Sequence, residues 1–210
     1  MTTPVPRKLS KGERTKTRIL EAALEVFSEQ GFSQTSVRDI ATRADITHVG
    51  LMHHFPSKDD MLVRILEFRE KQDEEDAARF ADLGIDRLFA WIVDIVDKNI
   101  AHPDRIRLFV TLSAEASSDE HPARAYFVRR YTRVIGALEA SFAAHFAVAP
   151  PRFEITPREA AESIVALMDG LQVQWLLFDG EIDMAARVRT HLAGLGVSLP
   201  ALPTGTKEPA

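Results

Sequence analysis

The stretch TSVRDIATRADITHVGLMHHFPSK, residues 35–58, decides how the chain is expected to fold. Ser36 stands just before an apolar pattern and Asp39 follows three residues later, so a hydroxyl and a carboxylate can cap the first turn of a helix. Apolar residues then recur at helical spacing as far as Asp45, and Thr47 is the next residue suited to an N-cap. The stretch therefore predicts two short helices joined by a tight turn.

The second short helix is expected at residues 48–54, with Leu51 and Phe55 facing inward. A proline ends it, and Ser57 caps a third helix that opens at Lys58. Two short helices with such a turn form a helix-turn-helix, whose second helix fits the major groove of DNA when the first holds it outward. The helix N-termini also direct backbone amides at phosphates. This stretch is thus expected to bind DNA.

The longer run RTKTRILEAALEVFSEQGFSQTSVRDIATRADITHVGLMHHFPSKDDML, residues 14–62, resembles the N-terminal domain of the TetR (tetracycline-repressor-like) family of bacterial regulators. A helix ending in FSEQGF, a second helix TSVRDIA and a third closing in HHFPSK carry the resemblance, which covers about a quarter of the chain. It implies an all-α fold, with an N-terminal three-helix helix-turn-helix domain and a C-terminal helical domain for ligand binding and dimerisation.

The resemblance also implies which side chains contact DNA. Base-edge positions of the family correspond to His48, Val49 and Gly50, and Arg38 corresponds to a position that reaches a base or a phosphate. Phosphate-contacting positions correspond to Ser36, Thr47, His53 and Lys58. The family usually has tyrosine where this chain has Met52, which lacks a hydroxyl for a phosphate and is expected to pack on a thymine methyl or a sugar.

Composition and charge fit a globular protein that meets DNA at one end. The 210 residues are 45% apolar and contain no cysteine, the N-terminus lacks the apolar run of a signal peptide, and no apolar segment is long enough to span a bilayer. We therefore expect a cytoplasmic protein. Although the net charge is −5, residues 1–18 carry +5 and the rest −10, so a basic arm precedes an acidic body.

Helical periodicity continues to the end of the chain, without the alternating pattern of strands. The expected divisions are a flexible basic arm at residues 1–11, a DNA-binding domain at 12–60, a helical effector-binding and dimerisation domain at 61–196 and a flexible tail at 197–210. The helix opening at Lys58 is long enough to connect the two domains. Later helices are expected to open at Asp104, Pro122 and Pro157.

The segment ESIVALMDGLQVQWLLF, residues 162–178, is apolar around most of its circumference and needs covering on two sides. A second copy of the chain is the expected cover, with the helix after Pro122 as the antiparallel neighbour, and the family resemblance implies the same four-helix contact. The alternative is a central helix buried within one copy. The expected dimer interface comprises Phe127, Tyr131, Val134, Leu138, Phe142, Ile164, Leu171 and Trp175.

An effector pocket is expected in the body, where large aromatic side chains meet a few polar ones. The candidates are Trp91, Phe109, Leu112, Glu115, Tyr126, Met168, Gln172 and Trp175. Glu115 and Gln172 each lie in an otherwise apolar stretch and need a partner if buried. Carboxylates at Glu115 and Asp169 would favour a cationic or hydroxyl-rich ligand, although Asp169 can instead bond within the dimer interface.

The expected function is a homodimeric transcriptional regulator, a repressor that a small molecule releases from a palindromic operator. Activation, a constitutive or architectural DNA-binding protein without an effector, and a helical enzyme with a DNA-binding head are the alternatives. The sequence contains no nucleophile elbow, phosphate loop or dinucleotide-binding glycine pattern, so we expect no catalytic residues and no cofactor. His53 and His54 lie about 100° apart on a helix and cannot chelate one ion, so no metal site is predicted.

Overall fold

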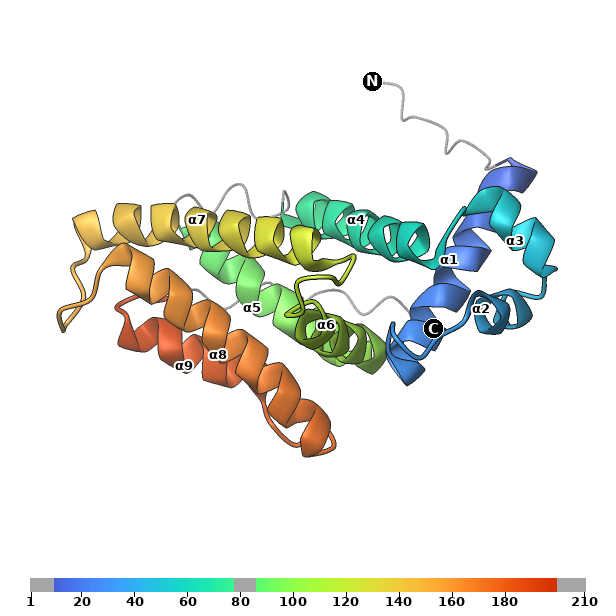
Figure 1. Ribbon diagram of the computed structural model, residues 1–210. Coiled ribbons are helices and arrows are strands. Elements are labelled where there is room, and N and C mark those ends of the chain that lie inside the picture. The colour runs from blue at the N-terminus through green and yellow to red at the C-terminus, as the bar shows by residue number, and fades with distance from the viewer. Residues whose placement is uncertain (1–9, 78–85, 200–210) are drawn as a thin grey trace, which may run out of the picture.

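The computed structural model of the protein describes residues 10–77 and 86–199, and the regular structure in this part of the chain is entirely helical (Figure 1). The all-α prediction is confirmed. The helices of the described residues are α1 (Lys11–Gln30), α2 (Val37–Arg43), α3 (His48–His54), α4 (Lys58–Ala77), α5 (Arg87–Ile100), α6 (Pro103–Glu115), α7 (Arg124–Val148), α8 (Pro157–Leu177) and α9 (Met184–Gly194).

The helix-turn-helix forms with the predicted caps. The Ser36 hydroxyl accepts from the Asp39 amide while the Asp39 carboxylate accepts from the Ser36 amide, which completes the capping box of α2. Thr47 caps α3 by accepting from the Gly50 amide at 3.0 Å, and Ser57 accepts from the Asp60 amide in the first turn of α4. Local hydrogen bonding therefore sets all three helix starts.

Gly31 ends α1 at a positive φ of 79°, where a residue with a Cβ would be strained. The turn after it returns Phe32 to the core, as expected, and the ring lies 5.4 Å from that of Phe27. Leu51 and Phe55 are also buried, as predicted, because α3 packs on α1 and α2 through its inner side. The opposite side of α3 faces outward.

Two apolar cores hold the molecule together. The first joins α1 to α4 with side chains of α6 and α7, including Leu108, Leu112 and Phe127. The second lies among α5, α7, α8 and α9. The expected boundary between residues 60 and 61 therefore cuts through α4, whose Met61 and Leu62 are buried in the first core. Helices α4 and α6 extend from the helix-turn-helix into the body (Figure 1).

Some expected element boundaries need correction. Helix α6 begins at Pro103 rather than at Asp104, and α7 begins at Arg124 rather than at Pro122. Val197 is buried in the second core, so the expected flexible tail cannot begin there. Residues 1–9 of the expected arm and 200–210 of the expected tail lie outside the described residues. None of the helices in the described ranges combines the length and the apolar composition needed to cross a bilayer.

Candidate functional site

The outward side of α3 carries most of the residues predicted to read bases. His48, Val49, Met52 and His53 are exposed, and Val49 is 78% exposed although it is apolar. In Figure 1, α3 lies at the end of the molecule away from α5 to α9, next to α1 and above α2. The structure thus brings these four side chains together on the side of α3 that faces away from the rest of the described chain.

Gly50 has a structural reason to lack a side chain. A Cβ at this position would lie 3.1 Å from the Thr47 hydroxyl oxygen, closer than an ordinary van der Waals contact. That hydroxyl already accepts from the Gly50 amide to cap α3. Gly50 therefore leaves room for the cap at the start of α3, in which the exposed Thr47 hydroxyl takes part.

The structure gives Lys58 a role within the domain that the sequence did not reveal. Its ammonium donates to the carbonyl oxygens of Phe32 and Thr35, both at 2.8 Å, and lies 4.2 Å from the centre of the Phe32 ring. Two of the three ammonium hydrogens are consequently used within the domain, where they hold the α1–α2 turn against α4. Lys58 positions the helix-turn-helix in this structure, whereas the exposed Arg38 on α2 keeps its charge at the surface.

An ion-pair cluster that the sequence did not reveal ties α2 to α1. The Arg43 guanidinium contacts the carboxylates of Glu29 at 2.7 Å and Glu25 at 3.0 Å. Glu25 and Glu29 lie one turn apart on α1, which was the available signal in the sequence. Arg43 lies 18 and 14 residues from them, so their pairing could not be inferred from spacing. The cluster fixes α2 in front of α1 and so helps to set the angle of α3.

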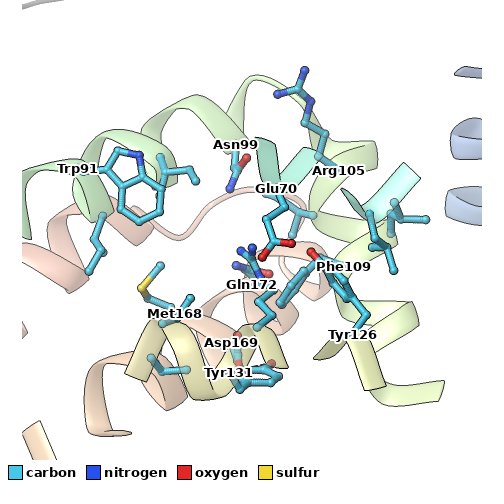
Figure 2. Close-up of a pocket in the computed structure, with 18 of the residues that line it drawn as sticks. Glu70, Trp91, Asn99, Arg105, Phe109, Tyr126, Tyr131, Met168, Asp169 and Gln172 are labelled. Carbon is cyan, nitrogen blue, oxygen red and sulfur yellow. Dashed lines mark hydrogen bonds between the residues drawn. The ribbon is translucent and has the colours of Figure 1, made fainter. Parts of the chain in front are cut away.

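The body contains a cavity of about 120 Å³ between α4, α5, α6, α7 and α8. Five of the eight predicted pocket residues line it, namely Trp91, Phe109, Tyr126, Met168 and Gln172. Figure 2 shows these side chains arranged around one space with Glu70, Asn99, Arg105, Tyr131 and Asp169. Glu70, Asn99 and Arg105 were missed because no periodicity distinguishes them from solvated polar residues.

The other three predicted pocket residues lie elsewhere. Leu112 is buried in the first core, and Trp175 packs in the second core with its ring 3.3 Å from the place of a Cβ on Gly180. The Glu115 carboxylate accepts from the backbone amides of Phe32 at 3.1 Å and Ser33 at 3.3 Å. The partner that Glu115 needed is thus the turn between α1 and α2, reached from the C-terminal end of α6.

Asp169 is a partly buried acid of the cavity wall. The Tyr131 hydroxyl donates to its carboxylate at 2.7 Å. Burial raises the pKa of Asp169, and the hydrogen bond from Tyr131 and the nearby charge of Arg130 partly offset that rise. Burial and the Asp169 carboxylate also raise the pKa of Tyr131, so the hydroxyl remains a donor at neutral pH. Glu70, on α4, forms an ion pair with Arg133 of α7.

The predicted dimer interface is corrected by burial within one copy. Phe127, Leu138, Phe142, Ile164, Leu171 and Trp175 are all buried among neighbouring helices of the same chain. Tyr131 and Val134 line the cavity instead. Helices α7 and α9 cover the side of α8 that carries Ile164, Leu171 and Trp175.

A different side of α7 and α8 is open. The two helices contact each other, and each also has exposed apolar or small side chains. On α7 this surface presents Gly136, Ala137, Ala140 and Ala144 together with the exposed Val128. On α8 it presents Val173 and Leu177, the latter 73% exposed.

Both parts of the chain match models of known protein families. Residues 19–65 match the model described as bacterial regulatory proteins, tetR family. Residues 84–197 match the model described as BetI-type transcriptional repressor, C-terminal. The second match alone covers more than half of the chain, and together the two matches span the helix-turn-helix and the body.

Individual relatives match this chain over most of their own length. The HTH-type transcriptional regulator AcrR of Shigella flexneri is 24% identical over 192 residues, which cover 86% of this chain and 87% of AcrR. Among solved structures, NalD, the secondary repressor of the MexAB-OprM multidrug efflux pump in Pseudomonas aeruginosa, is 25% identical with a TM-score of 0.69 over 89% of this chain and 96% of NalD. FadR of Bacillus subtilis, solved in complex with stearoyl-CoA, is 18% identical with a TM-score of 0.66 over 85% of this chain and 96% of FadR, a likeness of fold.

Proposed function

We propose, because this chain belongs to the TetR family of bacterial transcriptional regulators, that two copies bind a palindromic operator and repress transcription until a small molecule in the body cavity releases them. The observation that carries the proposal is the exposed side of α3 at one end of the molecule, together with a cavity in the body that α4 and α6 help to line. Repression is favoured over activation because the matched C-terminal model and NalD are both described as repressors.

In this proposal α3 is the recognition helix. His48 and Val49 contact base edges in the major groove, because they are exposed in its first turn. The Val49 side chain suits contact with a thymine methyl, and His48 suits a hydrogen bond with an acceptor or donor on a base edge. Met52 packs on a thymine methyl or a sugar. Phosphate contacts are proposed for the exposed residues that flank the base-reading positions, namely Ser36, Arg38, Thr47 and His53.

The dimer is proposed to form through the open side of α7 and α8. Small side chains on α7 allow a second pair of helices to approach closely, and the exposed Val128, Val173 and Leu177 supply apolar contact area. One short recognition helix reads only a few base pairs, so specific binding needs two heads held at a fixed separation. The sequence resemblance implies a homodimer with a four-helix contact, which supports the same arrangement.

The cavity is proposed to control the heads through α4 and α6. Leu66 and Glu70 of α4 line the cavity, and the first half of α4 is packed in the first core. Phe109 of α6 also lines the cavity, while Glu115 at the end of α6 binds the α1–α2 turn. A ligand that fits better when these helices shift would change the separation of two heads, and its differential affinity would set the extent of release.

A ligand-free, constitutive DNA-binding protein is less well supported, because the body encloses a cavity lined by polar and aromatic side chains. The structure of FadR with stearoyl-CoA supports a body of this fold that admits an organic ligand. The relatives are transcriptional regulators, which supports a role without catalysis. Such a regulator would act in the cytoplasm, where bacterial DNA lies.

Selection from a pool of random DNA duplexes tests the proposal. The purified chain should enrich an inverted repeat with half-sites about one helical turn apart, or a multiple of it. A variant with Val49 replaced by Ala is expected to enrich an altered half-site, because it loses its largest exposed apolar contact. Enrichment of no sequence, or of single unrepeated sites, would contradict the proposal.

A further inference from the structure

The charges that line the cavity do not all have partners within the protein. Four charged side chains take part in the lining, namely Glu70, Arg105, Arg130 and Asp169. Glu70 forms an ion pair with Arg133, so its charge is already matched. Asp169 accepts the Tyr131 hydrogen bond and is attracted by Arg130, which also lies 5.4 Å from the centre of the Phe109 ring. Neither acid therefore requires a cation from a ligand.

Arg105 is the remaining charge. Within residues 10–77 and 86–199 its guanidinium forms no ion pair and no hydrogen bond. It is the third residue of α6, where the helix N-terminus already carries partial positive charge and a cation is unfavourable. Helix stability consequently gives no reason for an arginine here, and the cavity wall carries an unmatched positive charge.

Arg105 lies at the rim of the cavity. In Figure 2 it is drawn at the opposite side from Asp169 and Tyr131 with its guanidinium turned away from the space, and Asn99 of α5 lies near it with its amide nitrogen toward the cavity. The Asn99 side chain also has no hydrogen-bond partner in the described chain. Between the rim and the Asp169 side, most of the wall is apolar, with Ile92, Ile95, Val134, Leu138, Val165 and Met168 contributing.

We propose that the cavity binds an amphipathic organic anion, a carboxylate with an apolar body of about one aromatic ring. Its carboxylate contacts Asn99 and the Arg105 guanidinium, which turns inward from the rim when the ligand binds. The inference deepens the proposed function by naming the chemical class of the effector, and it rests on the cavity being the effector site. The size follows from the volume, because a cavity of 120 Å³ is similar to one of about 150 Å³ that accepts benzene. Arginine and asparagine donors suit the two oxygens of a carboxylate.

Two sets of ligands that differ chiefly in the charge of the head group test this assignment on the full chain. The first set is phenylacetate, phenylacetamide and phenethylamine, and the second is hexanoate, hexanamide and hexylamine. Calorimetric titration should give roughly tenfold tighter binding of the carboxylate than of the amide or the amine in at least one set. The tightest binder should also raise the melting temperature most.

Arg105→Gln and Arg107→Gln provide a matched pair of variants. Arg107 lies two residues further along α6, is exposed, forms an ion pair with Asp104 and is not part of the cavity wall. Arg105→Gln should abolish the preference for the carboxylate, a loss of roughly tenfold in its affinity, and should leave the amide unchanged. Arg107→Gln should bind all six compounds as the parent chain does.

Three results would overturn the assignment. They are tighter binding of the amine or the amide in both sets, binding of no member at millimolar concentration, and a carboxylate preference that survives Arg105→Gln. Operator binding by each variant is measured separately without added compound. If the parent chain binds no operator DNA, the proposed function is contradicted. The calorimetric result tests the ligand class alone.

Discussion

Replacing Glu115 with alanine should loosen the helix-turn-helix from the body. The carboxylate accepts from the Phe32 amide at 3.1 Å and the Ser33 amide at 3.3 Å, across 83 and 82 residues of sequence. The turn that it holds begins at Gly31, where a Cβ would lie 3.1 Å from one carboxylate oxygen. No other side chain in the described part of α6 hydrogen-bonds this turn, so the change removes the contact completely.

The magnitude follows from the different surroundings of the two amides. Phe32 is buried, so its amide left without an acceptor costs about 1.5–2 kcal/mol. Ser33 is exposed, and water can replace the carboxylate there at a cost of about 0.5–1 kcal/mol. The free energy of unfolding should therefore fall by about 2–3 kcal/mol. Glu115→Gln keeps one acceptor oxygen and should lose about half as much.

Urea unfolding followed by circular dichroism measures this difference, with Glu120→Ala as the control. Glu120 is exposed beyond the end of the same helix and makes no hydrogen bond in the structure described. The control should unfold within about 0.5 kcal/mol of the parent chain. A Glu115→Ala variant as stable as the Glu120→Ala variant would refute the role given to this carboxylate.

Four further changes have expected outcomes. Lys58→Ala should lower the free energy of unfolding, measured by thermal unfolding, by about 1–3 kcal/mol because two backbone acceptors lose their donor. Unchanged stability with a reduced salt dependence of DNA binding would instead indicate a phosphate contact. His48→Ala should change the preferred half-site base by about 1–3 kcal/mol in competition binding, whereas equal weakening on all sequences would mean that readout lies elsewhere. Leu177→Glu should give monomers by sedimentation while Ala193→Glu, exposed on α9, stays dimeric; two dimeric variants would exclude this surface. Burial lowers the pKa of His121 below 6.5, so the unfolded chain binds the proton more readily and the free energy of unfolding should fall as the pH drops below 6.5. His121→Asn should reduce that fall, and a variant with the same pH profile as the parent chain would contradict this role of His121.

The helix-turn-helix could be predicted closely because its determinants are local. The caps at Ser36, Thr47 and Ser57 each use an amide three residues away, so sequence spacing is enough to locate them. Gly31 and Phe32 were likewise predicted from the short turn that joins α1 to α2. The structure adds the reason why Gly50 has no side chain, which depends on the Thr47 rotamer and not on spacing.

The pairing of distant surfaces could not be predicted in the same way. Helical periodicity shows that Leu171 and Trp175 need cover, but not whether α9 or a second copy supplies it. The expected dimer interface assigned this face to a second copy, whereas Met184 and Val188 of α9 pack in the same core as Leu171 and Trp175. The partner of Glu115 also lies far away in sequence, in a turn whose position only the packed α1 and α6 define.

The stoichiometry and affinity of the complex with DNA test the central claim most directly. Native mass spectrometry and fluorescence anisotropy would compare the selected inverted repeat with a duplex that carries one half-site. Two copies of the chain should occupy the repeat, with affinity at least about a hundredfold higher than for the half-site. One copy on each duplex with equal affinity, or no binding to either at low salt, would contradict a dimer that reads DNA through two α3 helices.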